Sequence, residues 1–248
     1  MKTTIIIPTS SILSHPSTEI LDETISTIRT HLPDSEIILM FDGLRKEHQD
    51  RRRTYNEYIR RALFKANTEY GNVYPVIFKE HHHQTGMTKA ILEYIRTETI
   101  LYIEQDTPLT PDWEIPFDNL EKIIKDGDSN LIRFHFESII PKEHNHMMLS
   151  TEKFRDVTLM KTVQWSQRPH LSSLAFYRRI LNDYFSENSK SFIEDKMHSV
   201  LHSAFIDDGE LGWHQFKTHI YYPKGSIKRS YHTDGRNGEA KYDDTQVF

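Results

Sequence analysis

The chain has 248 residues, a formal net charge of −5 at pH 7, and enough hydrophobic side chains (37%) for a sizeable core. These totals suit one large α/β domain, or one domain with an elaborated C-terminal part. The net negative charge argues against a protein that coats nucleic acid with positive charge. Arg45, Lys46 and the three arginines at 51–53 still leave room for a local basic groove.

The chain contains no cysteine. Disulfides, thiolate metal sites and cysteine nucleophiles are therefore excluded, and a cytoplasmic setting is favoured over a secreted one. The apolar run at residues 5–8 is too short for a signal peptide, and no stretch approaches the roughly 20 apolar residues that a membrane span needs. We therefore expect a cytoplasmic protein without a transmembrane segment.

Strands and helices alternate through the first 106 residues. The β-branched run at residues 3–7 predicts a central first strand, residues 19–31 repeat apolar side chains at helical spacing, and a second strand at 36–41 completes a βαβ unit. The alternation continues with a helix at 55–66, a strand at 72–79 placed near an edge by Pro75, a loop at 81–86, a helix at 87–95 and a strand at 100–103. This pattern predicts a doubly wound, mainly parallel α/β sheet.

The pattern loosens after Trp113. We expect a short helix near 120–124, a half-buried strand at 131–136, a loop or extended segment at 162–171, and helices at 174–185 and from 192 onward. Residues 221–248 are basic and aromatic and contain glycine, so they predict no packed helix. Trp165 and His170 could contact an acceptor sugar or base, and core packing is the alternative for Trp165.

Two carboxylates, Glu104 and Asp106, follow the strand at 100–103, and Pro108 and Pro111 end regular structure after them. Acidic side chains at the carboxyl end of a buried strand lie where open α/β sheets bind ligands. Two hard oxygen ligands there suit Mg²⁺ or Mn²⁺ held between the protein and a phosphate-bearing ligand. A solvated acidic turn is the alternative interpretation.

The three consecutive histidines at 81–83 also invite a metal interpretation. Adjacent side chains point in different directions, so three in a row rarely bind one ion. A surface loop near the ligand site is the favoured interpretation.

Four motifs occur in a defined order: 84–90 (QTGMTKA), 101–106 (LYIEQD), 109–113 (LTPDW) and 192–195 (FIED). Together they resemble the family 2 glycosyltransferases with a GT-A fold, and the likeness covers most of residues 1–205. The end of the first strand at Pro8 and Thr9, and the Asp42–Gly43 turn, are similar to the family's nucleotide-binding opening. The chain departs from the family in carrying Glu-Gln-Asp where Asp-x-Asp is usual.

The resemblance implies a metal-dependent, inverting glycosyltransferase that moves a sugar from a nucleoside diphosphate sugar, most simply a UDP-sugar, to an acceptor hydroxyl. The acceptor could be a glycan, a lipid, a protein or a modified nucleic-acid base. It also implies a nucleotide-sugar-binding half at 1–113, an acceptor-binding half at 114–220 and a basic tail or lid at 221–248.

The resemblance further assigns roles to individual residues. It implies a metal site of Asp106, Glu104 and His232, and a general base at Asp195 with Glu194 beside it. The residues expected to contact the donor are Pro8, Thr9, Asp42, Gly86, Lys89, Glu104, Gln105, Lys228 and Arg229. Lys224 and Arg236 belong to the same cationic tail. Structural alternatives stay open for the turn aspartate Asp42, for Lys89, and for the acidic pair that begins a helix.

Two other functions remain possible at this stage. A nucleotidyltransferase on a similar sheet would need a glycine-rich phosphate loop after the first strand, and residues 8–11 contain no glycine. A binding module that kept the fold and lost catalysis is consistent with the altered acidic motif.

Overall fold

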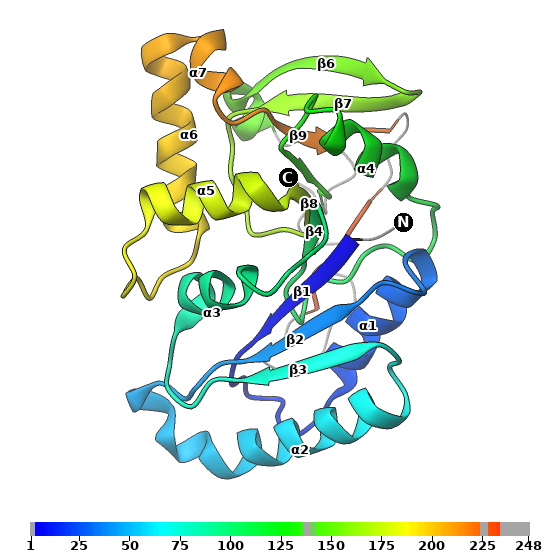
Figure 1. The fold of residues 1–248 in the computed structure, drawn as a ribbon, viewed down its shortest axis with the longest axis vertical. Helices are drawn as coiled ribbons and strands as arrows, with labels where there is room; N and C mark the ends of the chain where they lie inside the picture. The colour runs from blue at the N-terminus through cyan, green and yellow to red at the C-terminus, as the bar shows by residue number, and fades with distance from the viewer. Residues whose placement is uncertain (1–2, 136–139, 141, 224–227, 234–248) are drawn as a thin grey trace.

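The computed structural model describes residues 3–135, 140, 142–223 and 228–233, and these build one continuous nine-stranded sheet (Figure 1). The strand order is β3-β2-β1-β4-β8-β5-β9-β7-β6. The strands are β1 (Thr3–Thr9), β2 (Ile37–Phe41), β3 (Val73–Ile77), β4 (Thr99–Tyr102), β5 (Leu131–Arg133), β6 (Met148–Phe154), β7 (Val157–Thr162), β8 (His170–Ser173) and β9 (Thr218–Tyr221).

The helices of the described residues lie on both faces of this sheet. The α-helices are α1 (Glu19–His31), α2 (Arg52–Thr68), α3 (His83–Leu92), α4 (Phe117–Lys125), α5 (Leu174–Tyr184), α6 (Glu194–Asp208) and α7 (Glu210–His214), and the 3₁₀ helices are η1 (Lys46–Arg51) and η2 (Lys142–Met147). Residues of α1, α2 and α4 share one hydrophobic core, and residues of α3, α5 and α6 share the other.

The first strand is buried along its whole length because both faces of the sheet are covered. Ile5 and Ile7 pack into the first core and Ile6 into the second, as the two-residue period of a strand requires. A continuous apolar run, rather than an alternating one, is what a strand buried on both faces needs.

The sheet is mainly parallel, as the sequence predicted. β3, β2, β1 and β4 are parallel neighbours, and β5 is parallel to β9. β8 runs antiparallel between β4 and β5, and β7 runs antiparallel to β9 and β6. The strand β8 therefore joins the first half of the chain to the second within a single sheet.

The predicted edge position of the third strand is confirmed, because β3 is the first strand in the order. Even-numbered residues on either end of β3 bond to its neighbour β2: Ile37 N donates to the carbonyl of Asn72 (3.0 Å), and Phe78 N donates to the carbonyl of Phe41 (2.9 Å). Pro75 belongs to the odd-numbered set, which faces outward. A proline there removes one donor from the open edge and weakens pairing with another chain.

One expectation for local structure was wrong, and one element was not expected at all. The expected loop at 81–86 is partly helical, because α3 already begins at His83 and includes Gly86. The β6–β7 hairpin was not predicted. Its turn places Arg155 (φ 46°) and Asp156 (φ 67°) in the left-handed region that Asn-Gly turns usually signal, so the usual sequence signal is missing.

The described part of the C-terminal region, residues 228–233, is packed against the acidic motif. Thr110 N donates to the carbonyl of Arg229 (3.0 Å), Tyr231 N to that of Pro108 (3.0 Å), and Thr233 N to that of Asp106 (2.9 Å). These bonds align 229–233 antiparallel to 106–110. The tail residues Lys224 and Arg236 lie outside the described residues.

Within the described ranges, no helix combines the length and the apolar character that crossing a bilayer requires.

The loop after β1 is held by an aromatic stack. The ring of His15 lies on that of Tyr58, with centroids 3.7 Å apart, and 5.5 Å from that of Tyr55. Burial, together with the nearby charge of Arg51, lowers the pKa of His15 to about 3. The same loop carries Ser10 and Ile12, which line the pocket described below.

This pKa predicts an acid-sensitive fold. In the unfolded chain His15 has a pKa near 6.5 and becomes protonated below that pH, whereas in the folded protein it stays neutral down to about pH 3. Protonation therefore favours the unfolded state, and the folded protein loses stability as pH falls below about 6.5. Between pH 7 and pH 5 we expect the unfolding free energy of the wild type to drop by about 2 kcal/mol more than that of His15→Phe, which keeps the stacking ring. Urea unfolding of both proteins at several pH values measures this. Equal pH slopes would contradict it.

Candidate active site

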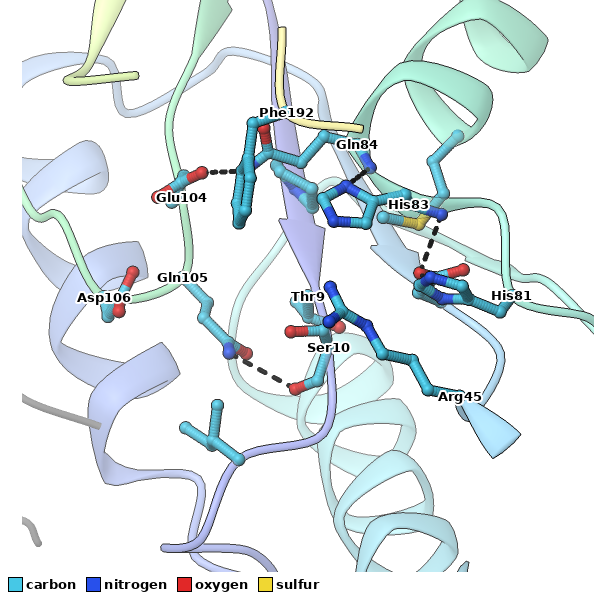
Figure 2. Close-up of a pocket in the computed structure, with 14 residues that line it drawn as sticks. Thr9, Ser10, Arg45, His81, His83, Gln84, Glu104, Gln105, Asp106 and Phe192 are labelled. Atoms are coloured by element: carbon cyan, nitrogen blue, oxygen red, sulfur yellow. Dashed lines mark hydrogen bonds and ion pairs between the residues drawn. The ribbon is translucent and has the colours of Figure 1, made fainter. Parts of the chain in front are cut away.

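A pocket of about 280 Å³ opens at the carboxyl ends of the parallel strands β1, β2 and β4 (Figure 2). Six residues expected to bind the donor or the metal line it: Pro8, Thr9, Asp42, Glu104, Gln105 and Asp106. They gather there because parallel strands end at the same edge of a sheet, which is where open α/β folds bind ligands.

Asp106 and His232 meet at the edge of this pocket. The Nε2 atom of His232 lies 3.6 Å from Oδ2 of Asp106, and the two side chains are 43% and 23% exposed. The segment 229–233 brings the histidine there through its pairing with 106–110. The two side chains are thus neighbours, and a shared metal ion between them stays a prediction.

The pair fits a divalent cation only with help from a ligand. The described residues hold no group of three or more His, Asp or Glu side chains arranged for a metal. Mg²⁺ and related ions are commonly held by one or two protein groups plus the phosphates of a substrate. Asp106 lines the pocket and His232 lies 3.6 Å from its carboxylate, so the pair suits that arrangement.

Glu104 is turned toward the amide of Gln84 rather than toward His232. Gln84 Nε2 donates to Oε1 of Glu104 (Figure 2). Burial and the neighbouring charge of Asp106 raise the pKa of Glu104 to about 8, against the lowering effects of Arg168 and Gln84. Glu104 and Asp106 line the same pocket, and a metal contact from Glu104 stays a prediction.

Asp42 holds the turn that precedes α3. Its Oδ1 accepts from the backbone N–H of Gly43 (2.9 Å) and of His82 (2.7 Å), and its Oδ2 accepts from that of His83 (2.9 Å). His81 Nδ1 lies 2.7 Å from the same Oδ2. The side chain is buried, so these contacts support the structural alternative for this turn aspartate. A direct contact to the nucleobase or ribose stays a prediction.

Removing the Asp42 carboxylate should weaken the fold. We expect Asp42→Ala to lower the unfolding free energy by about 3 kcal/mol, because three backbone N–H groups lose a charged acceptor in a buried site. Urea denaturation at pH 7 measures the change. Asp50→Ala, at an exposed position of η1, is the matched control and should stay within about 0.5 kcal/mol of the wild type. If Asp42→Ala also stays within about 0.5 kcal/mol of the wild type, the Asp42 carboxylate is not needed to hold the turn.

Gly86 and Lys89 lie elsewhere than expected. Both are on α3, and neither is among the described residues that line the pocket. A Cβ at Gly86 would lie 3.1 Å from Cβ of His82, so the glycine allows close packing of the turn. Lys89 Nζ donates to the carbonyl of Phe185 (3.4 Å), which directs its charge toward the end of α5.

Arg229 is buried rather than presented on a mobile surface. Its side chain is 1% exposed, and its guanidinium carbon lies 5.8 Å from the ring centroid of Tyr222. The expectation that this arginine closes over a diphosphate from outside is therefore not met by its position. Lys228 precedes it in the same packed segment and is partly exposed.

Glu194 and Asp195 form the first turn of α6 and face differently. Oε2 of Glu194 accepts from the backbone N–H of Gln167 (2.9 Å), whereas Asp195 is exposed. The charge of Glu194 also contributes to the raised pKa of Glu104, which places the start of α6 within electrostatic reach of the pocket. An exposed carboxylate is the one of the two that an incoming molecule can reach.

Solved structures share this architecture. Residues 1–349 of TarS from S. aureus align with a TM-score of 0.55 and 11% identity over 94% of this chain and 60% of TarS 1–349; the same protein in complex with UDP-GlcNAc gives 0.54 and 12%. The mannosyltransferase PcManGT from Pyrobaculum calidifontis, in complex with GDP-Man and Mn²⁺, gives 0.53 and 11% over 90% of this chain and 57% of that one. The chain has the GT-A fold.

The likeness is one of fold. No protein-family model and no curated protein matches the sequence. This GT-A chain spans about three-fifths of the length of the solved structures that it matches.

The GT-A pocket also contains two residues that were not expected to contact the donor, Arg45 and Phe192. Arg45 lines the pocket and its side chain extends toward Ser10 (Figure 2). The ring of Phe192 meets the ring of His83 edge to face at 4.5 Å, at the same pocket. The basic run at 45–53 was the only signal for Arg45. Phe192 and His83 are more than a hundred residues apart, so no local sequence pattern predicts that their rings pack together.

Trp165 and His170, considered as acceptor contacts, are both buried. The ring of His170 stacks on Tyr102 (5.1 Å) and on Tyr177 (5.5 Å), and burial lowers its pKa to about 4. Core packing, the alternative considered for Trp165, is therefore what both rings show.

Proposed function

We propose that this protein is a metal-dependent, inverting glycosyltransferase that uses a nucleoside diphosphate sugar, with a UDP-sugar as the first candidate. The observation that carries the proposal is the Asp106–His232 pair, 3.6 Å apart, at a pocket on the ligand-binding edge of a GT-A sheet. Solved structures with this fold hold UDP-GlcNAc in one case and GDP-Man with Mn²⁺ in another, which supports the donor class.

Asp106 and His232 would hold the cation, Mn²⁺ or Mg²⁺, together with oxygens of the donor diphosphate. When bound, such an ion stabilises the negative charge that develops on the departing diphosphate. Arg45 adds positive charge at the same pocket. Glu104, held by Gln84, lines the same pocket and would contact the donor there.

Asp195 would act as the general base. It takes the proton from the acceptor hydroxyl while the hydroxyl oxygen bonds to the anomeric carbon on the face opposite the diphosphate. The bond from that carbon to the phosphate oxygen breaks in the same step, and its electrons leave with the nucleoside diphosphate. The exposed position of Asp195 at the start of α6 supports this role, because an acceptor must approach it from solvent.

The acceptor is proposed only as a molecule with a free hydroxyl, whether on a glycan, a lipid, a protein or a modified nucleic-acid base. The division into a donor half at 1–113, an acceptor half at 114–220 and a tail from 221 also stays a proposal. It is supported by the pocket, which draws most of its residues from 8–106, and by α6, which carries the candidate base.

Calorimetric titration with UDP and GDP, each with Mn²⁺ or with EDTA, tests the proposal directly. We expect UDP to bind with Mn²⁺ and to lose at least about tenfold in affinity with EDTA, because the cation bridges protein and phosphates. Hydrolysis of the UDP-sugar in the absence of acceptor then tests whether the site activates the anomeric carbon. A protein that binds neither nucleotide would contradict the proposal, and binding without turnover of any donor would favour a catalytically inactive module.

A further inference from the structure

A line of side-chain hydrogen bonds crosses from the second half of the chain to the pocket. Trp165 Nε1 donates to Oε1 of Gln167 (3.3 Å), Gln167 Nε2 donates to Oε1 of Gln84 (2.6 Å), and Gln84 Nε2 donates to Oε1 of Glu104. We call these four residues the Trp165–Glu104 relay. Trp165, Gln167 and Gln84 are 2%, 8% and 8% exposed, so water competes little for these bonds.

The direction of the relay is fixed at its far end. An indole N–H can only donate, so the amide of Gln167 must turn its oxygen toward Trp165 and its nitrogen toward Gln84. The nitrogen of Gln167 also donates to the hydroxyl of Tyr102 (3.2 Å), which reinforces that orientation. Gln84 must then turn its oxygen toward Gln167 and its nitrogen toward Glu104. Glu104 therefore always receives a donor on Oε1.

The relay is tied to the helix that carries the candidate base. The backbone N–H of Gln167 donates to Oε2 of Glu194 (2.9 Å), in the first turn of α6. Thr85, the residue after Gln84, bonds to the loop before α6. Its backbone N–H donates to the carbonyl of Ser191 (3.3 Å), and its hydroxyl donates to the carbonyl of Ser189 (2.9 Å). The start of α3 thus contacts both halves of the proposed active site.

We propose that Gln167, acting through Gln84, is a positioning residue that fixes the orientation of Glu104 toward the nucleotide donor and couples it to the start of α6. Gln167 is not among the described residues that line the pocket, so its effect on the donor must pass through Gln84. This inference rests on the proposed function, since it assumes that the pocket binds a nucleotide.

Stability alone does not require this arrangement. Two buried amides bonded to each other add little net stability over apolar side chains of the same shape, because both must lose water first. Their distinctive effect is to allow one orientation for each group, since a reversed amide would place two acceptors or two donors together. A change at Gln167 should therefore alter ligand affinity more than it alters stability.

Calorimetric titration with UDP and Mn²⁺ tests the relay in four variants. We expect Gln167→Met to raise the Kd for UDP about fivefold, the middle of the range for a lost hydrogen bond between neutral groups. Gln84→Met should raise it as much or more. The double variant should be no weaker than the weaker single variant, because both changes break the same relay. Gln215→Met, at an exposed position after α7, makes the same chemical change outside the relay and should leave the Kd within twofold.

The outcomes separate the two proposals. No UDP binding by the wild type would overturn the proposed function and this inference together. UDP binding by the wild type with a Kd within twofold in Gln167→Met would overturn this inference alone, as would additive losses in the double variant. If Gln167→Met fails to fold, Trp165→Phe takes its place, because it removes the indole donor, keeps an aromatic ring in the core and keeps both glutamines. An increase of about threefold or more in Kd supports the relay, and an unchanged Kd overturns it.

Discussion

Replacing Asp106 by Asn should lower sugar transfer by about a thousandfold while the protein stays folded. Asparagine keeps the size of the side chain and one acceptor oxygen, but it removes the negative charge that the cation needs. Loss of a group that stabilises transition-state charge costs about 10²–10³ in rate, and loss of a metal ligand belongs at the upper end. Initial rates of UDP-sugar hydrolysis, or of transfer once an acceptor is known, measure the change.

The fold should survive this substitution because the packing around Asp106 uses its backbone. Thr233 donates both its N–H (2.9 Å) and its hydroxyl (3.1 Å) to the carbonyl of Asp106, and neither bond involves the carboxylate. Urea unfolding should therefore differ from the wild type by no more than about 1 kcal/mol. Asp183→Asn, at an exposed position on α5, is the matched control and should transfer at the wild-type rate. Full activity in Asp106→Asn would remove the metal proposal.

Asp195→Asn should lower kcat by about 10²–10⁴ and leave the Kd for UDP within twofold, because a general base acts on the acceptor and not on the donor. Glu194→Gln should have a much smaller effect. Its carboxylate accepts a bond from Gln167 N, and the amide oxygen of glutamine can accept the same bond. Steady-state transfer rates and UDP titrations of both variants, at matched Mn²⁺, make the comparison.

The pair of variants serves as its own control, since the two residues are adjacent on one helix turn. The general-base assignment requires the loss in kcat to follow Asp195. A large loss in Glu194→Gln with a small loss in Asp195→Asn would move the base to Glu194. Equal and small losses would show that the acceptor loses its proton to another group.

The first half of the fold could be predicted because its sequence obeys simple periodicities. The run at residues 3–7 and the helical spacing at 19–31 match β1 and α1, and Pro75 marks the edge strand. The carboxylates after β4 were identified for the same reason, since a buried strand followed by two acids and a proline has few interpretations. These signals lie within one element and need no knowledge of partners.

The rest depends on contacts that a linear pattern does not contain. The β6–β7 turn places Arg155 and Asp156 at positive φ, and it lacks the glycine or asparagine by which such a turn is usually predicted. Arg229 looked like a surface cation, but the pairing of its segment with 106–110 buries it. Asp42 was predicted to contact the donor. Its carboxylate instead accepts bonds from three backbone N–H groups, one in its own turn and two at the start of α3, some forty residues away. Each of these depends on where a distant segment lies.

The pairing of 229–233 with the acidic motif has a consequence for protein synthesis. Asp106 and Thr233 are 127 positions apart, so a ribosome adding about 5–20 residues per second translates the second on the order of ten seconds after the first. The nascent chain can form its N-terminal strands in that interval, but His232 has yet to be translated. If the proposed cation site exists, the emerging polypeptide should therefore complete it only near the end of translation.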